Sequence, residues 1–152
     1  MKLAIASDHA GVALKAALVQ HLTPLHALDD LGPHDTTSVD YPDFAHTLAL
    51  KVQSGEVERG ILICGTGIGM SIAANKVAGV RAAVVHDTFS AKACVEHNNL
   101  NVLCLGARVI GEGLALELCH VWLNAHFAGG RHQRRLDKIA ALESHTRVEC
   151  PR

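Results

Sequence analysis

Aromatic side chains are scarce in this sequence, and a large charge of one sign is absent. Only 3% of the 152 residues are Phe, Trp or Tyr, so a core must be built from the aliphatic side chains that dominate the 49% hydrophobic content. The formal net charge is -1, which excludes an overall field that would recruit nucleic acid or an anionic membrane. Any anion-binding site must therefore be local.

Long hydrophobic runs and paired cysteines are also missing. No stretch approaches the roughly 18 apolar residues that a membrane span needs, and the apolar start over residues 1–6 is too short for a signal peptide. The five cysteines are odd in number and include no C-x-x-C pair, which argues against a disulfide framework and against a zinc site. We therefore expect a cytoplasmic protein with reduced thiols and with neither a membrane nor a nucleic-acid partner.

Short aliphatic segments alternate with helical patterns along the chain. Five segments are typical of buried strands, namely 2–7, 25–31, 60–64, 80–86 and 102–105. Strands that are apolar on both faces and are separated by helices form parallel sheets covered on both sides. The sequence therefore predicts an α/β fold, a single-domain three-layer α/β/α arrangement around a five-stranded, parallel, doubly wound sheet. We expect this domain to span 1–143, with a C-terminal helix from about Arg131 towards Glu143 and a tail over 144–152.

In open parallel sheets, ligands bind beyond the carboxyl ends of the strands. The first predicted strand ends in Ser7-Asp8-His9, and the third ends in Cys64-Gly65-Thr66-Gly67-Ile68-Gly69, directly before a helical segment. Alternating glycines let the backbone turn tightly and aim several N–H groups at one point, which makes a cradle for a phosphate or an oxyanion. Taken alone, the loop leaves a plain tight turn open as the alternative.

The spacing of this loop differs from familiar phosphate-binding motifs. G-x-G-x-G is not the dinucleotide fingerprint G-x-G-x-x-G, and no Walker Lys-Ser/Thr pair follows it. A cysteine-dependent phosphatase has Arg after a five-residue loop, where this chain has Met70. Cys64 at the lip of the cradle is instead a candidate base, because oriented amides and the helix dipole stabilise a thiolate. A small hydrophobe ending a buried strand is the alternative.

Two histidines and two arginines also stand out. His9 follows a strand end and His97 stands at the close of a helix, although either position also suits a structural histidine. Arg131 and Arg135 are four residues apart and share a helical face in a first turn, where the macrodipole disfavours cations unless an anion compensates. A solvated basic patch is the alternative for the arginines.

Seven segments taken together resemble a known family, the type B ribose-5-phosphate isomerases, which also includes galactose-6-phosphate and allose-6-phosphate isomerases. The segments are Ser7 to Gly11, Asp40-Tyr41-Pro42, Gly60 to Gly69, Ile72 to Lys76, His97-Asn98-Asn99, Gly106 to Gly111 and Gly129 to His132. They occur in order over roughly residues 1–143, so the resemblance is far more specific than the glycine loop alone. It implies a Rossmann-like fold.

The resemblance further implies an aldose–ketose isomerase, an intramolecular oxidoreductase that interconverts D-ribose 5-phosphate and D-ribulose 5-phosphate through a cis-enediolate without metal or cofactor. It implies Cys64 as the base, His97 as the acid for ring opening and Asp8 as a partner of the sugar hydroxyls, with Thr66 also counted as catalytic. The other implied substrate contacts are Gly65, Thr66, Gly67, Ile68 and Gly69 through backbone N–H groups, Tyr41 lining the pocket, Asn98 on the sugar, and His9, Arg108, Arg131 and Arg135 on the phosphate.

Family sites lie between subunits, so the resemblance implies a homodimer or tetramer in which the neighbouring subunit can supply His97, Asn98 and Arg108. Some members use a glutamate shortly after the glycine loop instead of the cysteine; here Met70 follows the loop, so the chain resembles the cysteine users. Three alternatives stay open: an isomerase of allose 6-phosphate, galactose 6-phosphate or erythrose 4-phosphate, a non-catalytic phosphosugar-binding subunit, and a nucleotide-binding module of the stress-protein type.

Overall fold

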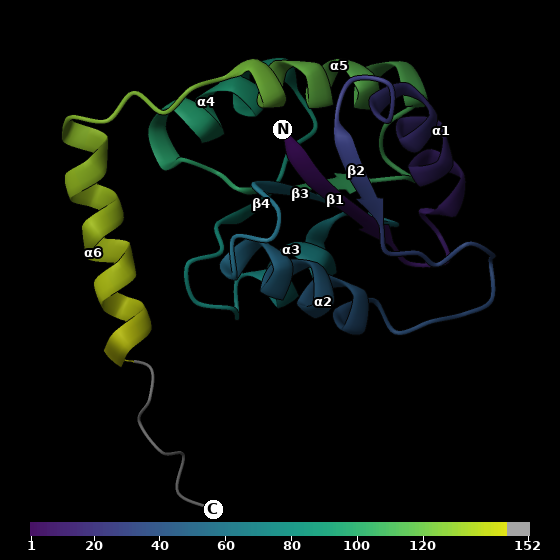
Figure 1. The fold of residues 1–152 in the computed structure, drawn as a ribbon, viewed down its shortest axis with the longest axis horizontal. Coiled ribbons are helices and arrows are strands. Elements are labelled where there is room, and N and C mark those ends of the chain that lie inside the picture. Colours follow the sequence, from purple (N-terminus) through teal and green to yellow (C-terminus); the bar gives the residue numbers. More distant parts are fainter. Residues whose placement is uncertain (146–152) are drawn as a thin grey trace, which may run out of the picture.

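One parallel sheet organises the protein, whose computed structural model describes residues 1–145 (Figure 1). Its strands are β1 (Lys2–Ser7), β2 (Ala27–Asp30), β3 (Arg59–Cys64), β4 (Ala82–Val84) and β5 (Val102–Gly106), in the order β2-β1-β3-β5-β4. This confirms the predicted fold class. The edge strands β2 and β4 are shorter than the aliphatic segments suggested, because each pairs with one neighbour only, and short edges are how parallel sheets limit exposed backbone.

Helices cover both faces of the sheet (Figure 1). They are α1 (Val12–Leu22), α2 (Tyr41–Gln53), α3 (Ile68–Ala74), α4 (Thr88–Asn98), α5 (Glu112–Asn124) and α6 (Arg131–His145). α1, α4 and α5 pack on one face, α2 and α3 pack on the other, and α6 stands at the side of the body. Within residues 1–145, no helix is long and apolar enough to cross a membrane.

The core consists of two apolar layers that share the strands. Alternate residues of a strand point to opposite faces, so Leu3 and Ile5 of β1 join the layer under α1, α4 and α5, whereas Ala4 and Ala6 join the layer under α2 and α3. Trp122 of α5, the one tryptophan of the sequence, is fully buried in the first layer. Burial on both faces explains why the strand segments are almost continuously apolar.

The direction of the chain separates two groups of residues named in the sequence analysis. All strands are parallel, so the carboxyl ends of β1, β3 and β5 lie together at one end of the sheet, where Cys64 is in register with Gly106. α4 crosses from the carboxyl end of β4 back to the amino end of β5. Its last residues, His97 and Asn98, therefore lie at the opposite end of the sheet, beside the amino ends of the strands. α6 ends at His145, two residues beyond the end that we predicted, and 146–152 lie outside the described residues.

Candidate active site

Cys64 ends β3 and is almost completely buried, at 5% exposure. The backbone amide of Gly67 donates a 3.1 Å hydrogen bond to its Sγ atom. Gly67 has φ +80°, and a Cβ atom there would lie 3.1 Å from the carbonyl carbon of Leu105. Only glycine fits this turn without strain, and the turn aims an N–H at the sulfur. Such a donor stabilises a thiolate.

The rest of the glycine loop is held against the end of β5. A Cβ atom on Gly106 would lie 2.9 Å from the carbonyl carbon of Thr66. Only glycine at this position allows the two backbones to approach so closely. The Ile68 amide donates a 3.3 Å hydrogen bond to Thr66 Oγ1, at the start of α3. These contacts fix the turn between β3 and α3, and they place the Gly67 amide at Cys64.

Asp8 and His9 follow β1, next to this loop. The Asp8 amide donates to the carbonyl of Ile63, the residue before Cys64, at 2.9 Å, and Asp8 as a whole is 8% exposed. Its Oδ1 atom accepts hydrogen bonds from the amides of Ala10 at 2.9 Å and Gly11 at 3.2 Å. His9 Nδ1 accepts from the Val39 amide at 3.4 Å, which leaves Nε2 as the donor of the neutral ring.

Tyr41 and Arg108 flank the loop on two sides. A Cβ atom on Gly69 would lie 2.7 Å from the ring of Tyr41, the first residue of α2, so this ring covers Gly69. The Arg108 amide donates to the Gly65 carbonyl at 3.0 Å, and a Cβ on Gly65 would lie 3.4 Å from Arg108 Nη1. Arg108 thus places a cation over the loop of its own chain, and no neighbouring subunit is needed to bring it there.

We call Asp8, His9, Tyr41, Cys64 to Gly69 and Arg108 the loop cluster. Its members come from the ends of β1, β3 and β5 and from the start of α2, which all lie at one edge of the sheet. Strand ends in the sequence pointed to Asp8, His9 and the loop from Cys64 to Gly69, whereas Tyr41 and Arg108 were implied only by the family resemblance. A cation, a carboxylate, a thiol and backbone donors could meet here around one small polyhydroxylated phosphate ester.

The remaining predicted site residues form a second group at the opposite edge, the helix-end cluster of His97, Asn98, Arg131 and Arg135. The rings of His97 and His132 stack with their centroids 4.4 Å apart and their planes 7° apart. This contact, together with a hydrogen bond from the Ala128 amide to the Glu96 carbonyl at 3.0 Å, fixes the start of α6 beside the end of α4. One chain therefore does not bring the two clusters together.

His132 was missed as a site residue by the sequence analysis, although it lies between the two arginines that were named. It is 8% exposed. Burial lowers the pKa of its imidazole, and the nearby His97, Arg131 and Arg135 lower it further. His132 is therefore a neutral stacking partner for His97 at neutral pH, and its signal in the sequence was only its place in the segment Gly129 to His132.

The thiols of the other described cysteines are expected to be poorly reactive. Burial raises the pKa of Cys94 to about 11 and that of Cys119 to about 12, and it raises the pKa of Cys104 still more strongly, with the neighbouring Cys64 adding to the effect. Cys150 lies outside the described residues. Within residues 1–145, no group of three or more His, Cys, Asp or Glu side chains is arranged to hold a metal ion.

Comparison with known proteins places these features in a family context. The family described as Ribose/Galactose Isomerase matches residues 3–139. A putative sugar phosphate isomerase of Bacillus subtilis is 57% identical over 94% of this chain and 97% of its own length. Ribose-5-phosphate isomerase B of Escherichia coli is 47% identical over 93% of this chain and 96% of its own. The solved structure of Clostridium thermocellum ribose-5-phosphate isomerase B is 49% identical, has a TM-score of 0.95, and covers 96% of this chain and 99% of that one.

Proposed function

Because the chain belongs to the ribose/galactose isomerase family, we propose that it is an aldose–ketose isomerase that interconverts D-ribose 5-phosphate and D-ribulose 5-phosphate. One observation carries the proposal: the Gly67 amide donates a hydrogen bond to Cys64 Sγ at the carboxyl end of β3. The resemblance implies that the catalytic base lies there, beside the glycine loop. Two of the relatives reported above are ribose-5-phosphate isomerases, and both match almost end to end.

In the proposed reaction, the Cys64 thiolate removes the proton from C2 of the open-chain aldose. The electron pair of the broken C–H bond forms the C1–C2 double bond of a cis-enediolate, and the former aldehyde oxygen takes the negative charge. The amides of loop 65–69 stabilise that charge more strongly than they stabilise the starting carbonyl, which is the source of rate enhancement. The thiol then returns the proton to C1, while the C2 hydroxyl proton moves to O1, so the product is the ketose.

Asp8, Arg108 and His9 position the substrate in this scheme. Since Asp8 Oδ1 is occupied by two amides of its own turn, a sugar hydroxyl would bind the other oxygen, Oδ2. Arg108, over Gly65, and His9 Nε2 would bind the phosphate or the oxygens of the sugar. Ring opening needs a proton donor near the ring oxygen, and the loop cluster holds no group that the resemblance assigns to this step.

We propose that a second copy of the chain supplies that group. In a homodimer or a dimer of dimers, the helix-end cluster of one subunit would face the loop cluster of its partner, with His97 as the acid, Asn98 on the sugar and both arginines on the phosphate. Apolar side chains left open around the loop support such an association: Ile68 is 55% exposed, Ile72 58% and Val109 55%. A cavity of about 440 Å³ between α6 and β4, lined by Leu100, Leu136 and Ile139, gives a partner further apolar surface.

The proposed setting of the reaction is the cytoplasm. Cys64 must stay reduced to act as a base, and the four described cysteines are all free thiols. This agrees with a reducing compartment.

Turnover of a panel of sugar phosphates tests the proposal. Ribose 5-phosphate, allose 6-phosphate, galactose 6-phosphate and erythrose 4-phosphate would be assayed with the wild-type protein and with Cys64→Ser in parallel. We expect the highest kcat/KM for ribose 5-phosphate and nearly no turnover by the variant. A different best substrate would change only the sugar, whereas binding without turnover of any of the four would point to a non-catalytic phosphosugar-binding subunit.

A further inference from the structure

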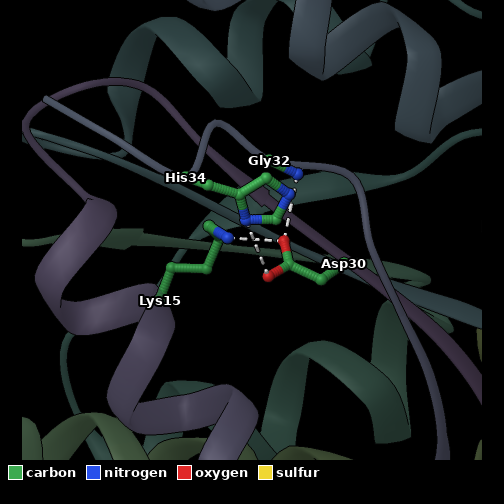
Figure 2. Close-up of polar contacts among 4 residues, drawn as sticks. All are labelled: Lys15, Asp30, Gly32 and His34. Atoms are coloured by element: carbon green, nitrogen blue, oxygen red, sulfur yellow. Dashed lines mark hydrogen bonds and ion pairs between the residues drawn. The ribbon is translucent and has the colours of Figure 1, made fainter. Parts of the chain in front are cut away.

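Lys15 of α1 and Asp30 of β2 form an ion pair in the core that the proposed chemistry does not use (Figure 2). Lys15 Nζ lies 2.5 Å from Asp30 Oδ1, Lys15 is 2% exposed, and the Asp30 side chain is 24% exposed. Lysine is almost never buried to this degree without a partner. A buried ion pair is a weak source of stability, because desolvation of the charges offsets their attraction. Its contacts therefore suggest a different role.

From Asp30, the contacts lead to the end of β1. The Gly32 amide donates a 3.0 Å hydrogen bond to the same Oδ1 atom that receives Lys15, and Figure 2 shows the carboxylate between these two donors. The Gly32 carbonyl then accepts a 3.0 Å hydrogen bond from the amide of Ser7, the residue before Asp8. The third neighbour, His34, is 3.7 Å from Oδ2 with its side chain 74% exposed, so it contributes little.

From Lys15, the contacts lead to the other side of the same turn. The Lys15 amide donates to the Gly11 carbonyl at 2.8 Å, and the Gly11 amide donates to Asp8 Oδ1 at 3.2 Å. A Cβ atom on Gly11 would lie 2.9 Å from the carbonyl oxygen of Ile63 and from Ser7 Cβ, so the turn fits tightly on the sheet. Together with the covalent chain, the hydrogen bonds of the two routes enclose the turn that carries Asp8 and His9.

The segment after Asp30 also reaches the loop cluster. It runs from Leu31, whose amide donates to the Ile5 carbonyl at 2.9 Å, to Val39, whose amide donates to His9 Nδ1. Tyr41 begins α2 two residues later. The ion pair therefore anchors the segment that orients the His9 ring as well as the turn that orients the Asp8 carboxylate.

We infer that Asp30, which Lys15 pairs with, is a positioning residue: its acceptor oxygen, through Gly32, holds Asp8 and His9 in place for the sugar phosphate. The inference rests on the proposed function for what the substrate is. Cys64 and its loop are held by β3 and β5 and share no hydrogen bond with the pair. Loss of the Asp30 acceptor should therefore weaken substrate binding much more than the proton-transfer step.

Two double variants separate positioning from stability. Lys15→Met with Asp30→Leu replaces both charges by apolar groups, which is often neutral for stability, but it removes the acceptor for the Gly32 amide. Lys15→Met with Asp30→Asn removes the charges and keeps that acceptor. We expect KM for ribose 5-phosphate to rise about tenfold in the Leu variant and to stay within about twofold of wild type in the Asn variant, with kcat within about threefold in both. Lys51→Met is the matched control, because Lys51 pairs with Asp29 near the surface, and its KM should not change.

Amide hydrogen exchange gives a readout that needs no substrate. In the Leu variant, the Ala10 and Gly11 amides should exchange faster while the Gly67 amide keeps its wild-type rate, as measured by NMR. If the Leu variant does not fold, Lys15→Met with Asp30→Ala takes its place, since it also removes the acceptor for the Gly32 amide.

A wild-type KM in the Leu variant overturns the inference, and so does an equal KM rise in both double variants, because that pattern would follow stability alone. If the wild-type protein turns over none of the sugar phosphates, the proposed function fails. The exchange rates then decide the positioning role, and unchanged rates at Ala10 and Gly11 overturn it.

Discussion

Gly67 donates its amide hydrogen to Cys64 Sγ over 3.1 Å, and Gly67 can do so because its backbone is in the left-handed region. This contact sets Cys64 apart from Cys94, Cys104 and Cys119, because burial raises the pKa of those three thiols. Arg108, whose side chain lies over Gly65, adds a cation beside the loop. Cys64 is therefore the described cysteine best placed to react as a thiolate.

Selective alkylation tests this assignment. In a Cys150→Ser background near pH 8, iodoacetamide should modify Cys64 at least about tenfold faster than Cys94 or Cys119, because burial raises the pKa of the latter two thiols to about 11 and about 12. Peptide mass spectrometry over time measures each rate, and ribose 5-phosphate should protect Cys64. Equal rates at Cys94 and Cys64 would contradict the assignment.

A glycine-to-alanine pair separates loop geometry from backbone strain. Gly67→Ala and Gly79→Ala both put a side chain on a residue with φ near +80°, which costs about 1 kcal/mol or more in each case. At Gly67 the new Cβ would also lie 3.1 Å from Leu105, whereas at Gly79 nothing lies within 4 Å. We expect both variants to lose stability in urea unfolding, but only Gly67→Ala to lose kcat, by about 10²-fold, as expected when an oxyanion donor is displaced. Equal kcat values for the two variants would remove the loop from catalysis.

The loop cluster was predictable from the sequence because its chemistry is local. Cys64 ends one aliphatic strand and Asp8 directly follows another, and the carboxyl ends of parallel strands lie together, so order in the sequence translates into proximity. The distance between Cys64 and His97 was not predictable in the same way. It depends on α4, which runs from the carboxyl ends of the strands to their amino ends and so carries His97 away from Cys64.

Lys15 shows a second limit of reading the sequence. It stands between Leu14 and Leu18 on the α1 stripe, where a lone lysine usually extends to solvent. Its burial depends on Asp30, which a different element brings to it, and no spacing rule connects the two. His132 is similar, because its role depends on the stacking contact with His97 in another helix.

Subunit mixing tests the shared site. Cys64→Ser damages the loop cluster, and Arg131→Ala with Arg135→Ala damages the helix-end cluster, so each homodimer should be nearly inactive. If sites form between subunits, random reassembly of equal amounts after joint unfolding and refolding should restore about one quarter of wild-type activity, because half the dimers are mixed and each has one intact site.

Arg134→Ala is the control for this experiment, since Arg134 is also exposed on α6 but carries no assigned contact. The control should behave as wild type on its own. Activity that stays at the sum of the two damaged parents would show that each site is built within one chain, and it would return Arg131 and Arg135 to a solvated surface role.

His132 gives the protein a predictable sensitivity to acid. Its pKa in the folded state is lowered by burial and by the neighbouring His97, Arg131 and Arg135, whereas an unfolded histidine titrates near about 6.5. Below that pH the unfolded chain binds the proton first, so stability falls as pH drops from about 6.5 towards the folded pKa, and this group has no effect above about pH 7.5.

Urea unfolding at pH 8.0, 6.5 and 5.5 measures that loss of stability. His132→Asn cannot take up a proton and should lose less stability between pH 6.5 and 5.5 than wild type, whereas the exposed-site control His126→Gln should keep the wild-type slope. KM should rise over the same interval in the wild-type enzyme. A charged His132 repels Arg131 and Arg135, and it weakens the stacking contact with His97 that holds α6 beside α4. If His132→Asn keeps the wild-type slope, the acid sensitivity arises elsewhere, and stacking on His97 does not require a neutral ring.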